Sequence, residues 1–182
     1  MITNISKSEI ETAIKGKGDF VQIDYLMKFL KEKLALDVKK FVYQKLAEIY
    51  ERKSMYNEVA KMFDNIALLS VSNAEKIYHY LNETKFFIKA GYFDRADEAM
   101  KKALSESNSP QKKEVYSAVK EFYNEQANIY LKQLKRGNAA RVYEKLLEMN
   151  ISDEERKEIK KKLLELYEKL GRLREYFSLK KS

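Results

Sequence analysis

The chain has 182 residues and no cysteine, which excludes disulfide bonds, thiolate metal sites and a cysteine nucleophile. Charged residues make up 35% of it, whereas Gly occurs five times and Pro once, a composition typical of helices rather than sheets. Residues 1–8 lack the apolar core of a signal peptide, and no stretch approaches the roughly 18 apolar residues of a membrane span, so we expect a soluble, cytoplasmic protein without membrane contact.

Hydrophobic spacing and helix-cap residues predict an all-α chain with essentially no strand. In chain order, the ten predicted helices span about residues 6–16, 19–34, 37–53, 55–70, 73–90, 92–106, 110–134, 136–149, 153–170 and 172–180. Four helix starts have capping-box spacing, namely Ser6 with Glu9, Asp19 with Gln22, Ser72 with Glu75, and Ser152 with Glu155. Ser109 before Pro110 is the arrangement of an N-cap followed by a first-turn proline.

One pattern of aromatic and small residues recurs along the chain, and its clearest copy is Phe87, Gly91, Phe93, Ala96 and Met100. The same spacing occurs in Tyr50, Ser54, Tyr56, Val59 and Phe63, in Tyr130, Leu134, Arg136, Ala139 and Tyr143, in Tyr167, Gly171, Leu173 and Tyr176, and more weakly in Ile14, Gly18, Phe20, Ile23 and Met27. In chain order, the second residues of successive copies, from Gly18 to Gly171, are 36, 37, 43 and 37 residues apart.

Each copy predicts two helices joined by a tight turn. The Gly-or-small position lies at that turn, where glycine adopts a positive φ without strain. The residue five positions later, such as Ala96 or Ala139, is then expected to be buried where the second helix crosses the first.

This pattern resembles the tetratricopeptide repeat, in which paired helices carry aromatic, Gly and Ala positions in this order. The resemblance covers nearly the whole chain and implies one helical-repeat domain over residues 1–182. It further implies a right-handed superhelix of about five helix-turn-helix units, with a concave surface that is lined by the first helix of each unit and binds proteins. The units depart from the family in their length and in a non-glycine residue at two turns, Ser54 and Leu134.

The resemblance also implies which polar side chains face the concave surface. The candidate partner-binding residues are Arg52, Asn82, Lys85, Lys89, Asn124, Asn128, Lys132 and Lys169. Arg52, Lys89, Lys132 and Lys169 hold the same place in four successive units, and we call them the cation row. An alternative role for these four cations is to offset the helix dipole, because each lies in the last turn of its helix.

Charge and aromatic content leave two kinds of partner open. Residues 1–109 carry 18 Lys/Arg against 16 Asp/Glu, and residues 110–182 carry 18 against 12. This favours a non-catalytic scaffold that binds a protein or an acidic peptide segment in a mildly basic groove. The alternative is a basic α-solenoid that binds RNA or a ribonucleoprotein, since 13 tyrosines and nine phenylalanines accompany the basic residues.

The sequence offers little for catalysis. His79, the single histidine, has Glu75 and Glu83 four residues away on either side, so a metal site is conceivable, but a solvated charged face explains the same spacing. No nucleophile-elbow or phosphate-binding loop motif is present. We therefore predict no enzyme activity, no catalytic residue, no metal and no cofactor.

The C-terminal segment carries an apolar strip of Leu173, Phe177 and Leu179 between basic residues. We expect this strip to be a contact surface, either in a homodimer or with a docked partner. The alternative is a last helix whose few apolar groups stay partly exposed.

Overall fold

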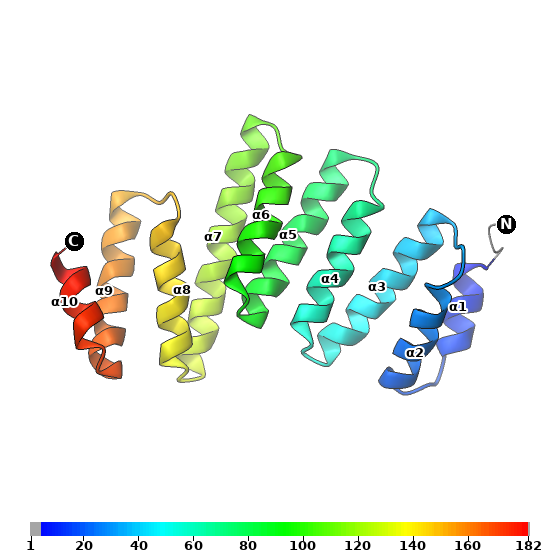
Figure 1. The fold of residues 1–182 in the computed structure, drawn as a ribbon, viewed down its shortest axis with the longest axis horizontal. Helices are drawn as coiled ribbons and strands as arrows, with labels where there is room; N and C mark the ends of the chain where they lie inside the picture. The colour runs from blue at the N-terminus through cyan, green and yellow to red at the C-terminus, as the bar shows by residue number, and fades with distance from the viewer. Residues whose placement is uncertain (1–4, 182) are drawn as a thin grey trace. The chain divides into compact units, whose positions relative to one another are not determined.

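The computed structural model describes residues 5–181, which form ten α-helices and no β-strand (Figure 1). This confirms the predicted all-α class. The helices are α1 (Lys7–Ile14), α2 (Asp19–Phe29), α3 (Leu36–Arg52), α4 (Tyr56–Leu68), α5 (Asn73–Ala90), α6 (Phe93–Ser105), α7 (Ser109–Lys132), α8 (Arg136–Glu148), α9 (Asp153–Leu170) and α10 (Leu173–Lys181).

The second helix is shorter than predicted. We expected it to continue to about residue 34, but α2 ends at Phe29 and the chain continues as a turn with hydrogen bonds from Lys31 N to Lys28 O and from Glu32 N to Phe29 O. Residues 31–33 are all charged and exposed, so no apolar side chain anchors a further helical turn there.

The predicted turn position joins the two helices of a pair at four places. Its residues, which we call the turn residues, have left-handed backbone with φ of 55° at Ser54, 78° at Gly91, 57° at Leu134 and 67° at Gly171. At each turn, the backbone N–H of the residue after the turn residue donates a hydrogen bond to an aromatic residue's carbonyl. That aromatic residue stands four positions before the turn residue. An example is the bond from Tyr92 N to Phe87 O at 3.0 Å. This is the six-to-one bond of a Schellman motif, and it satisfies a carbonyl that the helix end leaves unpaired.

The first copy of the pattern does not follow this rule. We placed its turn at Gly18, but Gly18 has φ of −65° and is the N-cap of α2, while Gly16 is left-handed at 70°. The prediction was wrong by two residues because Gly16-Lys17-Gly18 offers two glycines, and only one of them follows the helix end directly.

The predicted caps are confirmed at three of five helix starts. Ser6 and Ser152 form complete capping boxes, and Ser72 accepts from the N–H of Glu75. Asp19 and Ser109 are instead the first helical residues. Gly18 precedes Asp19, and Asn108 caps α7 by exchanging hydrogen bonds of 3.0 Å with Gln111.

The chain divides into two compact units within α7, between Val115 and Tyr116. In the first unit each of α1 to α5 packs against the next helix in the chain. The α4–α5 contact contains a row of stacked rings, in which Phe63 lies 5.6 Å from Phe86 and 6.0 Å from His79. In the second unit α9 packs against both α8 and α10.

Ion pairs link the first helix of one pair to the first helix of the next. The Nζ of Lys40 on α3 lies 3.2 Å from the carboxylate of Glu75 on α5, and that of Lys120 on α7 lies 2.6 Å from Glu155 on α9. Both glutamates stand three residues after a serine N-cap. The hydrogen bond from each lysine lowers the pKa of its glutamate, so both pairs stay ionised well below neutral pH.

Ala96 and Ala139, five positions after Gly91 and Leu134, are buried as predicted, with 1% of Ala96 and none of Ala139 exposed. We expect Ala96→Leu and Ala139→Leu each to lower the free energy of unfolding by about 1–3 kcal/mol, because the added carbons have no space at the helix crossing. Urea denaturation measures this, with Ala74→Leu on the exposed face of α5 as the matched control. Midpoints equal to that of the parent would show that these alanines do not lie at close crossings.

The turn at Leu134 carries avoidable strain, because left-handed backbone costs a residue with a Cβ roughly 1–2 kcal/mol. The Leu134 side chain is 74% exposed and contributes little packing. We expect Leu134→Gly to raise the free energy of unfolding by about 0.5–1 kcal/mol and the reciprocal Gly171→Leu to lower it. No heavy atom lies within 4 Å of a Cβ built on Gly171, so this pair isolates the backbone effect. A destabilised Leu134→Gly protein would contradict this account.

Candidate functional site

Two grooves lie between the first helices of consecutive pairs, one in each unit. The groove of the first unit has a volume of about 480 Å3 and runs between α1 and α3, with Gln22 of α2 at its edge. Its α3 wall includes Lys45, Glu48 and Arg52, the last of which is a candidate partner-binding residue.

The charges of this first groove bind one another. Lys45 lies 3.3 Å from Glu48 and 4.0 Å from Glu11, while Arg52 lies 2.8 Å from the carboxylate of Asp19. The hydrogen bond from Arg52 is the largest contribution to the lowered pKa of Asp19. A ligand that used Arg52 would therefore have to compete with Asp19.

The groove of the second unit has a volume of about 230 Å3 and lies between α7 and α9, with Tyr143 of α8 and Ile159 of α9 as its apolar part. Its rim carries two ion pairs, Lys120 with Glu155 and Lys162 with Glu158, each at 2.6 Å. The hydrogen bond from Lys162 lowers the pKa of Glu158, so this pair also remains ionised. We call this space the α7–α9 groove.

Asn124 and Asn128 lie in the α7–α9 groove one helical turn apart on α7. Among residues 5–181, no group hydrogen-bonds to either side-chain amide. Each amide offers two donors and one acceptor oxygen, which match the carbonyl and N–H groups of a peptide main chain. These two amides are the unoccupied hydrogen-bonding groups of the groove.

The other candidate residues are placed as follows. The amide of Asn82 donates to the carbonyl of Tyr78 on its own helix at 2.8 Å. The ammonium group of Lys89 lies 3.6 Å from Glu51 and 4.7 Å from the centre of the Phe86 ring. Lys85 is half-buried and engaged in a contact within the protein. The cation row is thus divided, because Arg52 and Lys89 are ion-paired whereas Lys132 and Lys169 are exposed without an ion pair among residues 5–181.

The C-terminal strip lies on α10. Leu173 is 59% and Phe177 56% exposed, and Leu179 is half-buried. The Tyr176 ring meets that of Phe177 edge to face at 5.4 Å. Two of the three strip residues therefore present their side chains to solvent.

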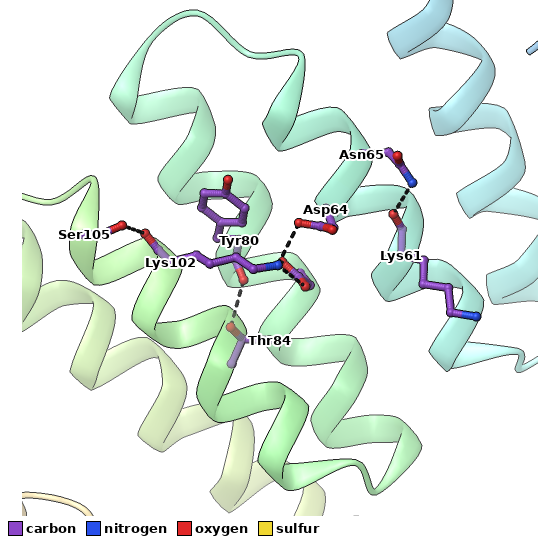
Figure 2. A network of polar contacts seen from close by, with 8 residues as sticks. Lys61, Asp64, Asn65, Tyr80, Thr84, Lys102 and Ser105 are labelled. Carbon is purple, nitrogen blue, oxygen red and sulfur yellow. Dashed lines mark hydrogen bonds and ion pairs between the residues drawn. The ribbon is translucent and has the colours of Figure 1, made fainter.

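An ionic cluster around the buried Glu83 in the first unit was not predicted. The ammonium group of Lys102 on α6 lies 2.8 Å from Asp64 on α4 and 3.0 Å from Glu83 on α5. Figure 2 shows Lys102 directed toward Asp64. Glu83 is only 3% exposed, and this burial raises its pKa to about 7. The sequence feature that could have revealed the cluster is Glu83, a charged residue on the same face of its helix as Tyr80 and Phe87.

His79 and its neighbouring glutamates do not form a metal site. Glu75 pairs with Lys40 and Glu83 with Lys102, while the His79 ring packs on Phe63 and Tyr78. Within residues 5–181, no three His, Asp or Glu side chains gather closely enough to hold a metal ion.

Comparison of the chain with known protein families, curated proteins and solved structures finds no match in any of the three. Every helix within residues 5–181 is either too short or too polar to cross a bilayer.

The buried Glu83 predicts a pH dependence of stability. Because its pKa is raised from 4.5 to about 7 on folding, the folded state binds more protons than the unfolded state between these values. Glu83 should therefore lower the free energy of unfolding as pH rises through this window, by on the order of 3 kcal/mol.

Urea denaturation between pH 4 and 8 tests this by comparing the parent with Glu83→Gln. We expect the free energy of unfolding of Glu83→Gln to increase relative to that of the parent as pH rises. The exposed Glu98→Gln serves as the matched control and should show a constant difference. A constant difference for Glu83→Gln would mean that folding leaves the pKa of Glu83 unchanged.

Proposed function

We propose that the chain is a non-catalytic protein-binding scaffold whose α7–α9 groove holds an extended acidic segment of a partner protein. The observation that carries this proposal is the pair of unoccupied amides, Asn124 and Asn128, in a groove that also includes Tyr143 and Ile159. Ligand sites commonly combine an apolar surface with a few such convergent polar groups.

The spacing of the two amides suits a main chain rather than a compact ligand. Equivalent points one turn apart on a helix are separated by about 5.4 Å, and alternate residues of an extended peptide by about 6.6 Å. Each amide can therefore bond a different residue of the same extended segment. Main-chain hydrogen bonds of this kind give affinity, and the pockets beside them give specificity.

The preference for acidic residues follows from the charges that remain available. Lys120 and Lys162 are already neutralised by Glu155 and Glu158, so they add little net charge to the rim. Lys132 and Lys169, in the last turns of α7 and α9, are the exposed cations of the row in this unit. An Asp or Glu side chain of the bound segment would pair with one of them, with a gain that decreases at high salt.

The resemblance to the tetratricopeptide repeat supports a protein-binding role, since the four left-handed turns recur at the spacing that carries it. The superhelix of about five units that it implies remains a prediction. A non-catalytic role is supported by the position of the single histidine, whose ring lies against Phe63 and Tyr78.

Panning an extended-peptide library on the full chain tests the proposal. We expect the selected peptides to be rich in Asp and Glu and to bind the double variant Asn124→Ala/Asn128→Ala at least about tenfold more weakly, because two hydrogen bonds of about 1 kcal/mol each are lost. Asn138→Ala, an exposed amide on α8 outside the groove, is the matched control and should bind as the parent does.

Two outcomes would contradict the proposal. One is peptide binding that is unchanged in the double variant. The other is preferential binding of single-stranded RNA with a steep salt dependence that reports the number of neutralised phosphates. The second outcome would favour the RNA-binding alternative.

A further inference from the structure

A second concave surface lies on the α9–α10 pair, away from the α7–α9 groove. It has a volume of about 350 Å3 and includes Lys157, Leu164 and Glu168 of α9 and Tyr176 of α10. Leu164 and Tyr176 are half-buried, and no helix of residues 116–181 covers them. We call this surface the α9–α10 face.

In two earlier pairs a following first helix is ion-paired to the corresponding first helix. Leu164 stands seven residues before its turn residue, as do Ala47 in the α3–α4 pair and Ala127 in the α7–α8 pair. Ala47 is 6% exposed and Ala127 is fully buried. In the first unit α5 is joined to α3 by the ion pairs Lys40–Glu75 and Lys89–Glu51, and in the second unit α9 is joined to α7 by the ion pair Lys120–Glu155.

One end of that following helix is held by a lysine, and Lys157 is the matching residue on the α9–α10 face. Lys40, Lys120 and Lys157 all stand 14 residues before the turn residue of their pair. Lys40 binds Glu75 and Lys120 binds Glu155, in each case a first-turn glutamate of the following helix. Among residues 5–181, Lys157 has no such carboxylate partner.

The other end of the following helix is matched as well. Glu51 stands three residues before its turn residue and pairs at 3.6 Å with Lys89, in the last turn of α5. Glu168 holds the same place in the α9–α10 pair, and no cation among residues 5–181 pairs with it. The face thus presents a cation at one end and an anion at the other, about three helical turns apart on α9.

We infer that the α9–α10 face docks an amphipathic helix of a protein partner, parallel to α9, with a carboxylate in its first turn and a cation 14 residues later. The carboxylate pairs with Lys157, the cation pairs with Glu168, and apolar residues between them cover Leu164 and Tyr176. This is the pattern of α5, with Glu75 and Lys89, and of α9, with Glu155 and Lys169. The face is separate from the α7–α9 groove, so the inference does not depend on the proposed peptide binding.

A helix of this pattern is available as a probe. It is a synthetic, N-acetylated peptide with the sequence of residues 152–171, which contains α9 with its cap and turn residues. Fluorescence anisotropy of the labelled peptide titrated with the full chain should show saturable binding. Lys157→Glu in the full chain should weaken binding about tenfold, and the same peptide with Glu155→Lys should recover the loss on that variant.

Three controls accompany the titration. Lys101→Glu changes an exposed lysine of α6 in the same way and should leave binding unchanged. A peptide with Glu155→Lys and Lys169→Glu tests orientation, because reversing the end charges should weaken binding to the parent chain. Asn124→Ala/Asn128→Ala should bind the helical peptide as the parent does, which separates this surface from the groove.

The inference is overturned by absence of saturable binding to the parent chain. It is also overturned if Lys157→Glu has no effect, or if Glu155→Lys fails to rescue that variant. Light scattering provides one more test. Self-association of the full chain that Lys157→Glu abolishes would assign the face to a second copy of the chain instead.

Discussion

Every helix pair after the first depends on a chain reversal at one left-handed residue. At Ser54, Gly91, Leu134 and Gly171 the same bond runs from the next N–H to the carbonyl of a buried aromatic residue four positions earlier. The bond fixes both the end of one helix and the start of the other, so positions counted from the turn recur in similar surroundings, as at Val59, Ala96 and Ala139 and at Lys40 and Lys120. Burial at five residues after the turn and ion pairing at 14 residues before it are consequences of this one constraint.

The same regularity determines where charge is available for binding. A chain with a net charge of +8 would be expected to present basic grooves. Instead, lysines and arginines in both grooves are largely neutralised by carboxylates of the same or the neighbouring pair. Exposed ion pairs of this kind contribute little to stability, but they remove cations from the surface that a ligand could use. In the proposed complex, recognition in the α7–α9 groove would depend on the side-chain amides of Asn124 and Asn128 and on Lys132 and Lys169, rather than on a continuous basic surface.

Much of the helical framework could be predicted because its signals are local in the sequence. Turn residues, serine caps and aromatic spacing placed most helix ends within two residues, and they also identified Ala96 and Ala139 as buried. Where two local signals competed, as at Gly16 and Gly18, the prediction was wrong. The cluster of Asp64, Glu83 and Lys102 could not be predicted, since its members lie on three helices and only packing brings them together. For the same reason, the sequence placed Arg52 and Lys89 in one row of cations but could not show that Asp19 and Glu51 pair with them.

The central claim is that Asn124 and Asn128 bind the main chain of an extended partner, and their side-chain N–H groups report this directly. In a ¹⁵N-labelled sample of the 21.5 kDa chain, the side-chain amide resonances of both asparagines can be followed while an acidic peptide is added. The account predicts that both pairs of resonances shift together and saturate at the same peptide concentration, while those of Asn138 stay in place. Saturable binding that leaves the resonances of Asn124 and Asn128 unmoved would contradict it.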